Sequence, residues 1–387
     1  MKIIHLADSH LGFSAYNRVD SKGRNQREEN IYEDFKIVID RIIEEHPDAV
    51  VHAGDVFHHV RPRIKPLLIF KRALDKLRDE GIPVIIISGN HDSPKSQATT
   101  SPFTLYEGMR DVFIARRYRY EKFEVGDSNF HCIPFCQNVE DYKKKFEEIC
   151  RSENDVLVMH GLMESIRDKR LNTVGEHELS ESFLRKDFKY IALGHYHGRA
   201  RIAGNAWYSG SIEYFRFSDM YDKKKGLLLV DLDRDSIDPK PIYIEEITPM
   251  KQYSIECDEL SAEEIMAELQ SKCDNEGIKD IIVRIKLDNI SRSTFRNLNR
   301  SQINKFMSDA LYFELFPKYL GESVVKTGET VDTSKIPEEF ERFISDEIQR
   351  DRVPRTIQRD VANYGKDLIQ KIIQARTTEV LDAASQP

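Results

Sequence analysis

The sequence predicts an α/β fold, in which helices cross a sheet of buried strands, and three observations carry this prediction. Short apolar runs at residues 2–7 and 83–88 are typical of strands that are buried on both faces. In residues 28–45 apolar side chains recur at helical spacing, and Pro47 marks the end of that helix. The later predicted strands are 190–193, 206–209, 226–231 and 241–247. They follow one another without helices, so the second half is expected to pack as a sheet against the first.

Length and composition bound the classes of protein to which the chain can belong. With 387 residues, of which 40% are hydrophobic, it is long enough for one large core and one or two smaller units. A net charge of -8 argues against coating nucleic acid through bulk charge and leaves a local basic groove open. The five cysteines are odd in number and scattered, which predicts a reducing, intracellular protein. No run approaches ~18 apolar residues, so neither a signal peptide nor a membrane span is expected.

Polar residues follow five of the predicted strands where each strand ends. In chain order they are Asp8 and His10, Asp55, Asn90 with His91 and Asp92, His160, and His195 with His197. Period-two geometry places Asp8 and His10 on the same side of an extended chain. Asp55 follows a glycine and has two carboxylate oxygens, so it can bridge a pair of cations. Asp92 is placed to orient the imidazole of its neighbour His91.

Taken singly, each of these turns has an ordinary explanation. A turn Asp more often caps a helix, and a single His at a strand end is more often a satisfied polar side chain than a ligand. Five such turns after five apolar strands are a different case, because open α/β sheets bind ligands just outside the carboxyl ends of their strands. Oxygen and imidazole donors without a thiolate suit Mn, Fe or Zn. The sequence therefore predicts one metal site.

The order of these motifs resembles the calcineurin-like metallophosphoesterase superfamily over roughly residues 1–250. The resemblance implies a metallophosphoesterase β-sandwich flanked by helices, with a binuclear centre. The implied metal ligands are Asp8, His10, Asp55, Asn90, His160, His195 and His197. Asp55 would bridge the ions, with Asp8, His10 and His197 on one ion and the other three residues on the second. A metal-activated water would attack phosphorus, and His91 would protonate the leaving oxygen.

Four longer motifs, at residues 5–13, 54–58, 89–94 and 209–213, narrow the resemblance to DNA double-strand-break repair nucleases of the short, archaeal-type prokaryotic form, distantly related to bacterial SbcD. The implied activity is a Mn-dependent exonuclease on duplex ends and endonuclease on single-stranded or hairpin DNA. Two Mn²⁺ ions are the implied cofactors, with Mg, Fe or Zn not excluded. His58 would position the phosphate, helix capping being the alternative. The implied partner is an SMC-like ABC ATPase, and the implied location is cytoplasmic, with the nucleoid.

The chain after residue 250 is expected to form two further parts. The predicted domains are 1–249, the nuclease; 250–334, a DNA-capping domain; and 335–387, a helical tail that binds the ATPase. A strand–helix–strand pattern at 252–257, 262–273 and 280–287 supports the capping domain. The tail is predicted to form helices at 337–350 and 358–376. One face of the second helix is apolar and is expected to pack against a partner protein. Packing of the tail back onto its own domain is the alternative.

A homodimer is expected through helices 64–78 and 102–109, paired with the same helices of a second copy as a four-helix bundle. The side chains that support it are Leu67, Leu68, Ile69, Phe70, Phe103, Leu105 and Tyr106. On pattern alone, deep burial of helix 64–78 within one chain explains the same residues. DNA is expected to be held through its phosphates, with these candidates: Tyr16, Arg18, Arg61, Arg63 and Arg216.

Two other functions compete with the nuclease. A phosphoprotein phosphatase or cyclic-nucleotide phosphodiesterase of the same superfamily would share the metal motifs but would not need the cap or the tail. A catalytically inactive scaffold would have lost ligands, and all seven ligand positions are filled in this sequence.

Overall fold

The computed structural model describes residues 1–96, 99–116, 118–149, 155–166, 178–184, 187–222, 224–320 and 364–365. The chain divides into two units, Met1–Glu322 and Ser323–Pro387. The predicted tail helices lie outside the described residues, except that Tyr364 and Gly365 are helical.

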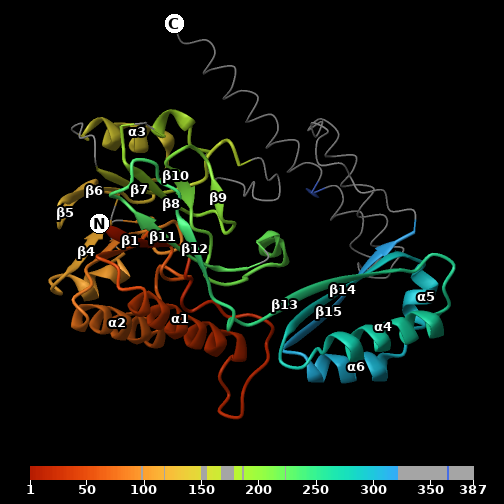
Figure 1. Ribbon diagram of the computed structural model, residues 1–387. Coiled ribbons are helices and arrows are strands. Elements are labelled where there is room, and N and C mark those ends of the chain that lie inside the picture. The colour runs from red at the N-terminus through yellow and green to blue at the C-terminus, as the bar shows by residue number, and fades with distance from the viewer. Residues whose placement is uncertain are drawn as a thin grey trace, which may run out of the picture. The chain divides into compact units, whose positions relative to one another are not determined.

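Two sheets, each of six strands over the described residues, form the larger part of the first unit (Figure 1). The first has the order β12-β11-β1-β2-β3-β4, in which β1 to β4 are parallel. The second has the order β5-β6-β7-β8-β10-β9, in which β6, β7, β8 and β10 are parallel. The strands of the first sheet are β1 Lys2–Leu6, β2 Ala49–His52, β3 Val84–Ile87, β4 Val112–Ala115, β11 Gly226–Asp231 and β12 Lys240–Tyr243. Those of the second are β5 Glu121–Val125, β6 Ser128–Ile133, β7 Val156–His160, β8 Tyr190–Gly194, β9 Ala200–Arg201 and β10 Ala206–Tyr208.

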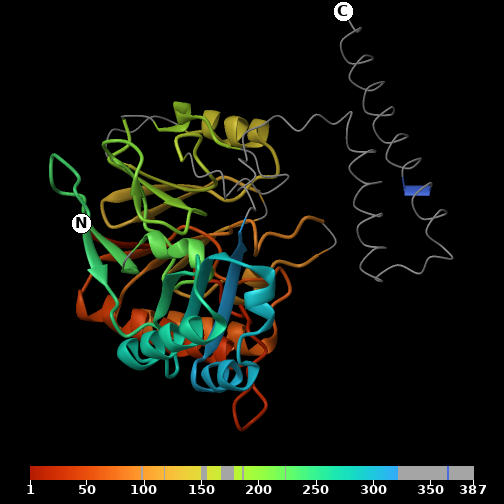
Figure 2. The same cartoon turned by 90° about the vertical axis from the view of Figure 1, so that its right-hand side faces the viewer.

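Helices cover the outer faces of both sheets. In both views α1 and α2 lie on one side of the sheets and α3 lies on the other (Figure 1 and Figure 2). The helices are α1 Gln26–Glu44, α2 Ile64–Asp79 and α3 Val139–Glu147, with 3-10 turns η1 Pro102–Tyr106, η3 Glu181–Phe183 and η4 Phe217–Tyr221. None of the helices in the described ranges is long and apolar enough to cross a membrane. The predicted α/β sandwich flanked by helices is confirmed.

Strand alternation explains why the molecule has layers. Successive side chains of β1 point to opposite faces, so Ile4 packs against α1 and α2 while Ile3 lies between the two sheets. Both faces of β1 are therefore buried, which explains why its sequence is a nearly continuous apolar run. α1 begins where the Asn25 side chain accepts a hydrogen bond from the backbone N–H of Glu28, an N-cap.

A third, smaller sheet follows, with the order β13-β14-β15 and all strands parallel. Its elements are β13 Met250–Glu256, α4 Ala262–Glu276, β14 Ile282–Ile290, α5 Arg292–Arg296, α6 Arg300–Asp309 and β15 Tyr312–Tyr319. One face packs against its own helices. The near ends of the strands join the core under the first sheet through Met250, Ile282 and Leu311. The predicted strand–helix–strand unit is present here, and the domain boundaries at 250 and 335 stay predictions.

The predicted helix 102–109 is wrong in extent. Only the 3-10 turn Pro102–Tyr106 forms, and Phe103 and Tyr106 are buried in the chain's own core beside Phe57. In α2, Phe70 is likewise buried, whereas Leu68 is 47% exposed. The four-helix bundle therefore lacks its second pair of helices, and the apolar residues that remain at the surface near this helix are Ile64, Leu68 and Leu105.

Candidate metal centre

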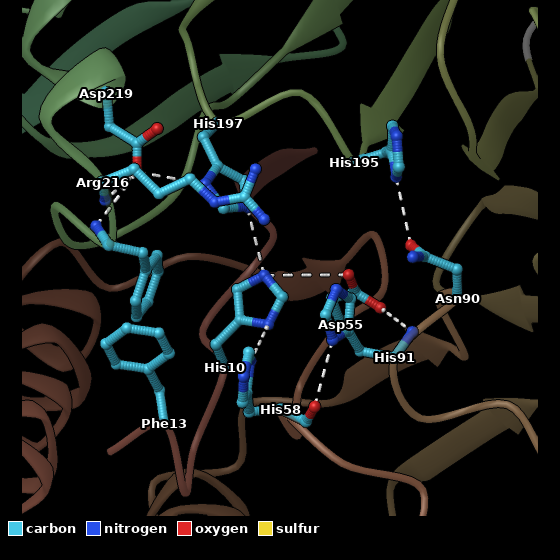
Figure 3. Close-up of a pocket in the computed structure, with 11 residues that line it drawn as sticks. His10, Phe13, Asp55, His58, Asn90, His91, His195, His197, Arg216 and Asp219 are labelled. Atoms are coloured by element: carbon cyan, nitrogen blue, oxygen red, sulfur yellow. Dashed lines mark hydrogen bonds and ion pairs between the residues drawn. The ribbon is translucent and has the colours of Figure 1, made fainter. Parts of the chain in front are cut away.

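The loops that follow β1, β2, β3 and β8 converge on one pocket (Figure 3). The pocket has a volume of about 80 Å³. It is lined by His10, Phe13, Asp55, His58, Asn90, His91, His195, His197, Phe215, Arg216 and Asp219. Five of the seven predicted ligands are in this lining, and the buried Asp8 and His160 lie directly behind it, with donor atoms close to those of His10, His197 and Asp55.

Three residues form the first group of donor atoms. Nε2 of His10 lies 3.1 Å from Nε2 of His197, and a carboxylate oxygen of Asp8 completes the group. Asp8 is fully buried, and its carboxylate accepts the backbone N–H of His195 at 3.0 Å. Asp8 therefore joins the loop after β1 to the loop after β8.

The second group is built on the other side of Asp55. Oδ1 of Asn90 lies 2.9 Å from Nε2 of His160 and 3.1 Å from Nδ1 of His195. His160 is fully buried, and its Nδ1–H donates to the backbone carbonyl of Ala53 at 2.8 Å. This hydrogen bond fixes the tautomer, so the lone pair of Nε2 points at the site.

Asp55 stands between the two groups (Figure 3). Its Oδ2 lies 3.7 Å from Nε2 of His10 and 3.6 Å from Nε2 of His160. Its Oδ1 accepts the backbone N–H of His91 at 2.9 Å. One oxygen of Asp55, Oδ2, therefore faces both groups, while Oδ1 accepts a backbone N–H.

The donor spacing fits a pair of divalent cations. Donors bound to one ion at ~2.1 Å lie about 3.0–3.4 Å from one another in octahedral or tetrahedral geometry. The His10–His197 and Asn90–His195 separations, both 3.1 Å, lie in this range. The Asn90–His160 separation of 2.9 Å lies just below it, and the distances of 3.6 and 3.7 Å from Oδ2 of Asp55 lie just above it. Burial lowers the pKa of His10 and His160 well below the ordinary value, and neighbouring imidazoles lower it further. Both rings are therefore neutral, which is the form that binds a metal.

The backbone reaches this geometry through left-handed residues, not through extended ones. The φ angles are 55° at Asp8, 44° at His10, 55° at Asp55 and 102° at His195. The expectation that Asp8 and His10 converge because they share one side of an extended chain is wrong. Non-glycine residues with positive φ cluster at functional sites, because other contacts must hold them in this conformation.

Two glycines make room for the donors. A Cβ on Gly54 would lie 2.3 Å from Nδ1 of His160, and one on Gly89 would lie 2.1 Å from Oδ1 of Asp55. Gly54 also has a φ of 99°. At Gly54 and Gly89 the missing side chain thus allows two segments of the chain to approach closely.

His58 and His91 form a third pair at the pocket. Their rings stack with centroids 4.9 Å apart, and Nδ1–H of His91 donates to the backbone carbonyl of His58 at 3.0 Å. Burial and the neighbouring imidazoles lower the pKa of His58 to about 3. The buried carboxylate of Asp92, which the sequence predicts to orient His91, accepts the backbone N–H groups of Phe57 and Gly89 and so connects the loops after β2 and β3.

Comparison with known proteins decides the family. Residues 1–221 match the model of the calcineurin-like phosphoesterase family. The chain belongs to this family.

Curated relatives of this phosphoesterase are called DNA double-strand break repair protein Mre11. The protein of Methanocaldococcus jannaschii is 30% identical over 279 residues, which are 67% of this chain and 68% of the relative. That of Methanococcus maripaludis is 30% identical over 272 residues, 66% of this chain and 68% of the relative. That of Sulfurisphaera tokodaii is 28% identical over 351 residues, 86% of this chain and 85% of the relative. The predicted family and the predicted class of enzyme, a metal-dependent phosphodiesterase, are confirmed. Membership implies a binuclear site for divalent cations.

Sequence reasoning missed three residues that support the site of this phosphoesterase. Asp219, in η4, faces Nδ1 of His197 with Oδ2 at 3.1 Å. The ring of Phe215 packs against His10 and His197, with centroids 4.9 and 5.5 Å away. Lys225 is buried and donates from Nζ to the backbone carbonyl of His197 at 2.7 Å. All three lie in the long segment between β10 and β11, several residues after the end of β10, so no residue pattern at a strand end marks them.

The predicted DNA contacts are placed in different surroundings. Arg216 lines the pocket. Arg61 lies at the surface, with Nη2 3.5 Å from the hydroxyl oxygen of Thr99. Tyr16 instead stacks on Tyr312 of the third sheet, with ring centroids 4.0 Å apart. Tyr16 is therefore engaged within the chain.

Proposed function

We propose that the chain is a DNA nuclease that hydrolyses phosphodiester bonds with two divalent cations, Mn²⁺ above all, in the repair of double-strand breaks. The observation that carries the proposal is the pair of donor groups that share Oδ2 of Asp55, in a chain related to proteins named for double-strand break repair. The proposed ligands are Asp8, His10, Asp55, Asn90, His160, His195 and His197. A pair of divalent ions held there would neutralise charge on the phosphate oxygens and lower the pKa of water.

The side chains around the ions would divide the remaining work. His91 is held through Nδ1 by the His58 carbonyl, so its Nε2 is the atom that would deliver a proton to the leaving oxygen. His58 stacks on His91 and would position the phosphate. Arg216 lines the pocket as a cation and would hold an adjacent phosphate without reading sequence.

Substrate and partners follow the same proposal. The nuclease would act on duplex ends as an exonuclease and on single-stranded or hairpin DNA as an endonuclease. Residues 335–387 would bind the SMC-like ABC ATPase. A homodimer would form over α2 and η1, where Ile64 and Leu68 of α2 are 75% and 47% exposed and Leu105 of η1 is 64% exposed.

End-labelled duplex and hairpin DNA, incubated with Mn²⁺, Mg²⁺, Fe²⁺ or Zn²⁺, test the activity. We expect nucleotide release that is greatest with Mn²⁺, weakens steeply with salt and varies little with sequence. A phosphopeptide, a cyclic nucleotide and bis(p-nitrophenyl) phosphate serve as competing substrates. Hydrolysis of the phosphopeptide or the cyclic nucleotide, with intact DNA, would replace the nuclease by a phosphatase or cyclic-nucleotide phosphodiesterase.

A further inference from the structure

The third sheet contacts the element that supports one half of the metal centre. The guanidinium carbon of Arg284, on β14, lies 3.9 Å from the centre of the Phe217 ring, and Phe217 begins η4. Nε–H of Arg284 donates to Oε2 of Glu314 on the neighbouring strand at 2.7 Å. The cation is thus fixed by its own sheet and placed against the nuclease part.

η4 transmits this contact to His197. Asp219, two residues after Phe217, accepts the backbone N–H groups of Phe215 and Arg216, each at 3.0 Å, with the same Oδ2 that faces Nδ1 of His197. Phe217 therefore cannot shift without displacing the carboxylate, because the turn around Asp219 is closed by its own hydrogen bonds. The Phe215 ring, carried by the same turn, packs against His10 and His197.

The other half of the centre is anchored differently. His160 is held by the carbonyl of Ala53, next to the last residue of the buried strand β2. A displacement of η4 would therefore move His197 through Asp219, whereas His160 has its own anchor at Ala53.

We propose that Arg284 is a positioning residue for His197, acting through Phe217 and Asp219, so that the seating of the third sheet on the nuclease part sets the cation affinity of one half of the centre. This inference rests on the proposed two-ion site. The first rung of the third sheet, where Tyr312 stacks on Tyr16, seats the sheet. Ile282 pairs with Tyr312, and Arg284 lies two residues further along β14, where it pairs with Glu314. A partner or DNA that tilts this sheet would alter the grip on His197.

Calorimetric titration of the full chain with Mn²⁺ tests the proposal without requiring DNA. Asp219→Asn should weaken one of the two ions about 10- to 100-fold, as the loss of a carboxylate partner of a metal-binding imidazole does. Arg284→Ala should weaken the same ion by about three- to tenfold, the size of a cation–π contact, and leave the other unchanged. Arg284→Lys should restore part of the loss. Phe217→Leu, which removes the ring and keeps an apolar side chain, should match Arg284→Ala.

The double variant separates positioning from general destabilisation. If Arg284 acts through Asp219, the combination of Arg284→Ala and Asp219→Asn binds Mn²⁺ no more weakly than Asp219→Asn alone. Arg300→Ala is the matched control, because Arg300 lies over the Phe295 ring within the third sheet's own helices, 5.1 Å from its centre. It should change neither ion. In the metal-free chain, the ¹⁵N signal of His197 Nδ1–H should shift in Arg284→Ala and not in Arg300→Ala.

Several outcomes would overturn the coupling. Equal weakening of both ions, additive losses in the double variant, or an unchanged His197 signal would each show that Arg284 serves only the fold. A different result would separate the coupling from the nuclease function. If the wild-type chain binds two Mn²⁺ and the single and double variants behave as described, but DNA stays intact, the nuclease function is refuted and the coupling stands.

Discussion

The two-sheet part, residues 1–243, and the three-stranded part, Met250–Tyr319, differ in the range of the contacts that fix their loops. All twelve histidines of the chain lie within the first 197 residues, and the three-stranded part has none. In the two-sheet part, short strands end in left-handed residues whose side chains meet across the fold. In the three-stranded part, local rules suffice: Ser261 and Glu264 form a capping box that begins α4. Local sequence rules therefore predict the conformation of the three-stranded part. They do not predict the loops of the two-sheet part, whose conformation depends on contacts between residues far apart in the sequence.

The largest expected effect is the loss of both ions in Asp55→Ala, because Oδ2 of Asp55 is the atom that faces both donor groups. Mass spectrometry of the native chain should find neither ion, and phosphodiester hydrolysis should fall by more than about 10⁴-fold. Amide exchange in β14 should stay at the wild-type rate, which sharpens the contrast between the two parts.

His160→Ala is the matched control for that substitution, since it removes a donor from the second group alone. We expect one ion to remain in it. One fully occupied ion in Asp55→Ala would mean that Asp55 does not bridge. Faster amide exchange in β14 would show that the loss of the ions also destabilises the three-stranded part.

The next effect concerns His91. His91→Ser should retain both ions and lose cleavage by about 10²- to 10⁴-fold, the usual contribution of a general acid. Single-turnover cleavage of duplex DNA and metal analysis of the same sample measure the two quantities together. An empty metal site in the folded variant would assign His91 to ion binding instead.

A pair of substitutions in α2 comes third. Phe70 packs against Phe57 and Tyr106, so Phe70→Asp should lower the free energy of unfolding by several kcal/mol, about 3–5 for the lost aromatic core contact alone. Leu68→Asp, at a half-exposed position, should change it by less than about 0.5 kcal/mol.

Sedimentation of the two variants distinguishes a residue of the core, Phe70, from a residue of the proposed dimer interface, Leu68. Leu68→Asp should dissociate the proposed homodimer while the chain keeps its fold. A wild-type chain that sediments as a monomer at micromolar concentration would remove the homodimer from the proposed function.

The last expected effect is a pH dependence of stability that belongs to the two-sheet part. Burial lowers the pKa of His5 and of His52 to about 3 in the folded chain. Between the ordinary value near 6.5 and about 3, the unfolded chain binds protons that the folded chain does not. The free energy of unfolding should therefore fall as pH falls through this window, by up to about 1.4 kcal/mol per pH unit for each histidine, and should not change from this cause above pH ~7.

Fluorescence of Trp207, the single tryptophan, reports on the second sheet and measures this slope in the metal-free chain. His52→Gln should reduce the slope by about one proton, because Gln carries no titrating group and can still reach the hydroxyl of Ser9, which His52 contacts at 2.8 Å. Loss of β14 protection at the same pH as the Trp207 transition would show that both parts unfold as one.

The sequence predicts the α/β class and the position of the site well because both depend on period and on strand ends. Apolar runs locate β1, β2, β3, β7 and β8, and the carboxyl ends of parallel strands meet whatever the loops do. The conformation of the loops does not follow from such patterns. Asp8 and His10 adopt left-handed φ angles that no period-two rule contains. They are stabilised by contacts such as the Asp8 carboxylate with the His195 backbone, 187 residues away.

Supporting residues are harder still to predict than ligands. Asp219 lies in a five-residue 3-10 turn after a loop, and its role exists only because that turn comes to rest beside His197. The predicted extent of the helix at 102–109 is wrong for a related reason. Phe103 and Tyr106 are apolar at helical spacing, yet their burial against Phe57 decides their conformation and a 3-10 turn is enough to achieve it.

The left-handed backbone at Asp8, His10 and Asp55 also limits how heat-resistant this chain can become. Each such residue costs about 1 kcal/mol, whereas glycine occupies the same region without that penalty. Selection for thermal tolerance without divalent cations would favour glycine at the positions of the proposed ligands. Selection with cations present would retain the ligands, because ion binding stabilises the folded state by mass action. The tolerance of this protein to heat is then set by the free cation concentration of its surroundings as well as by its sequence.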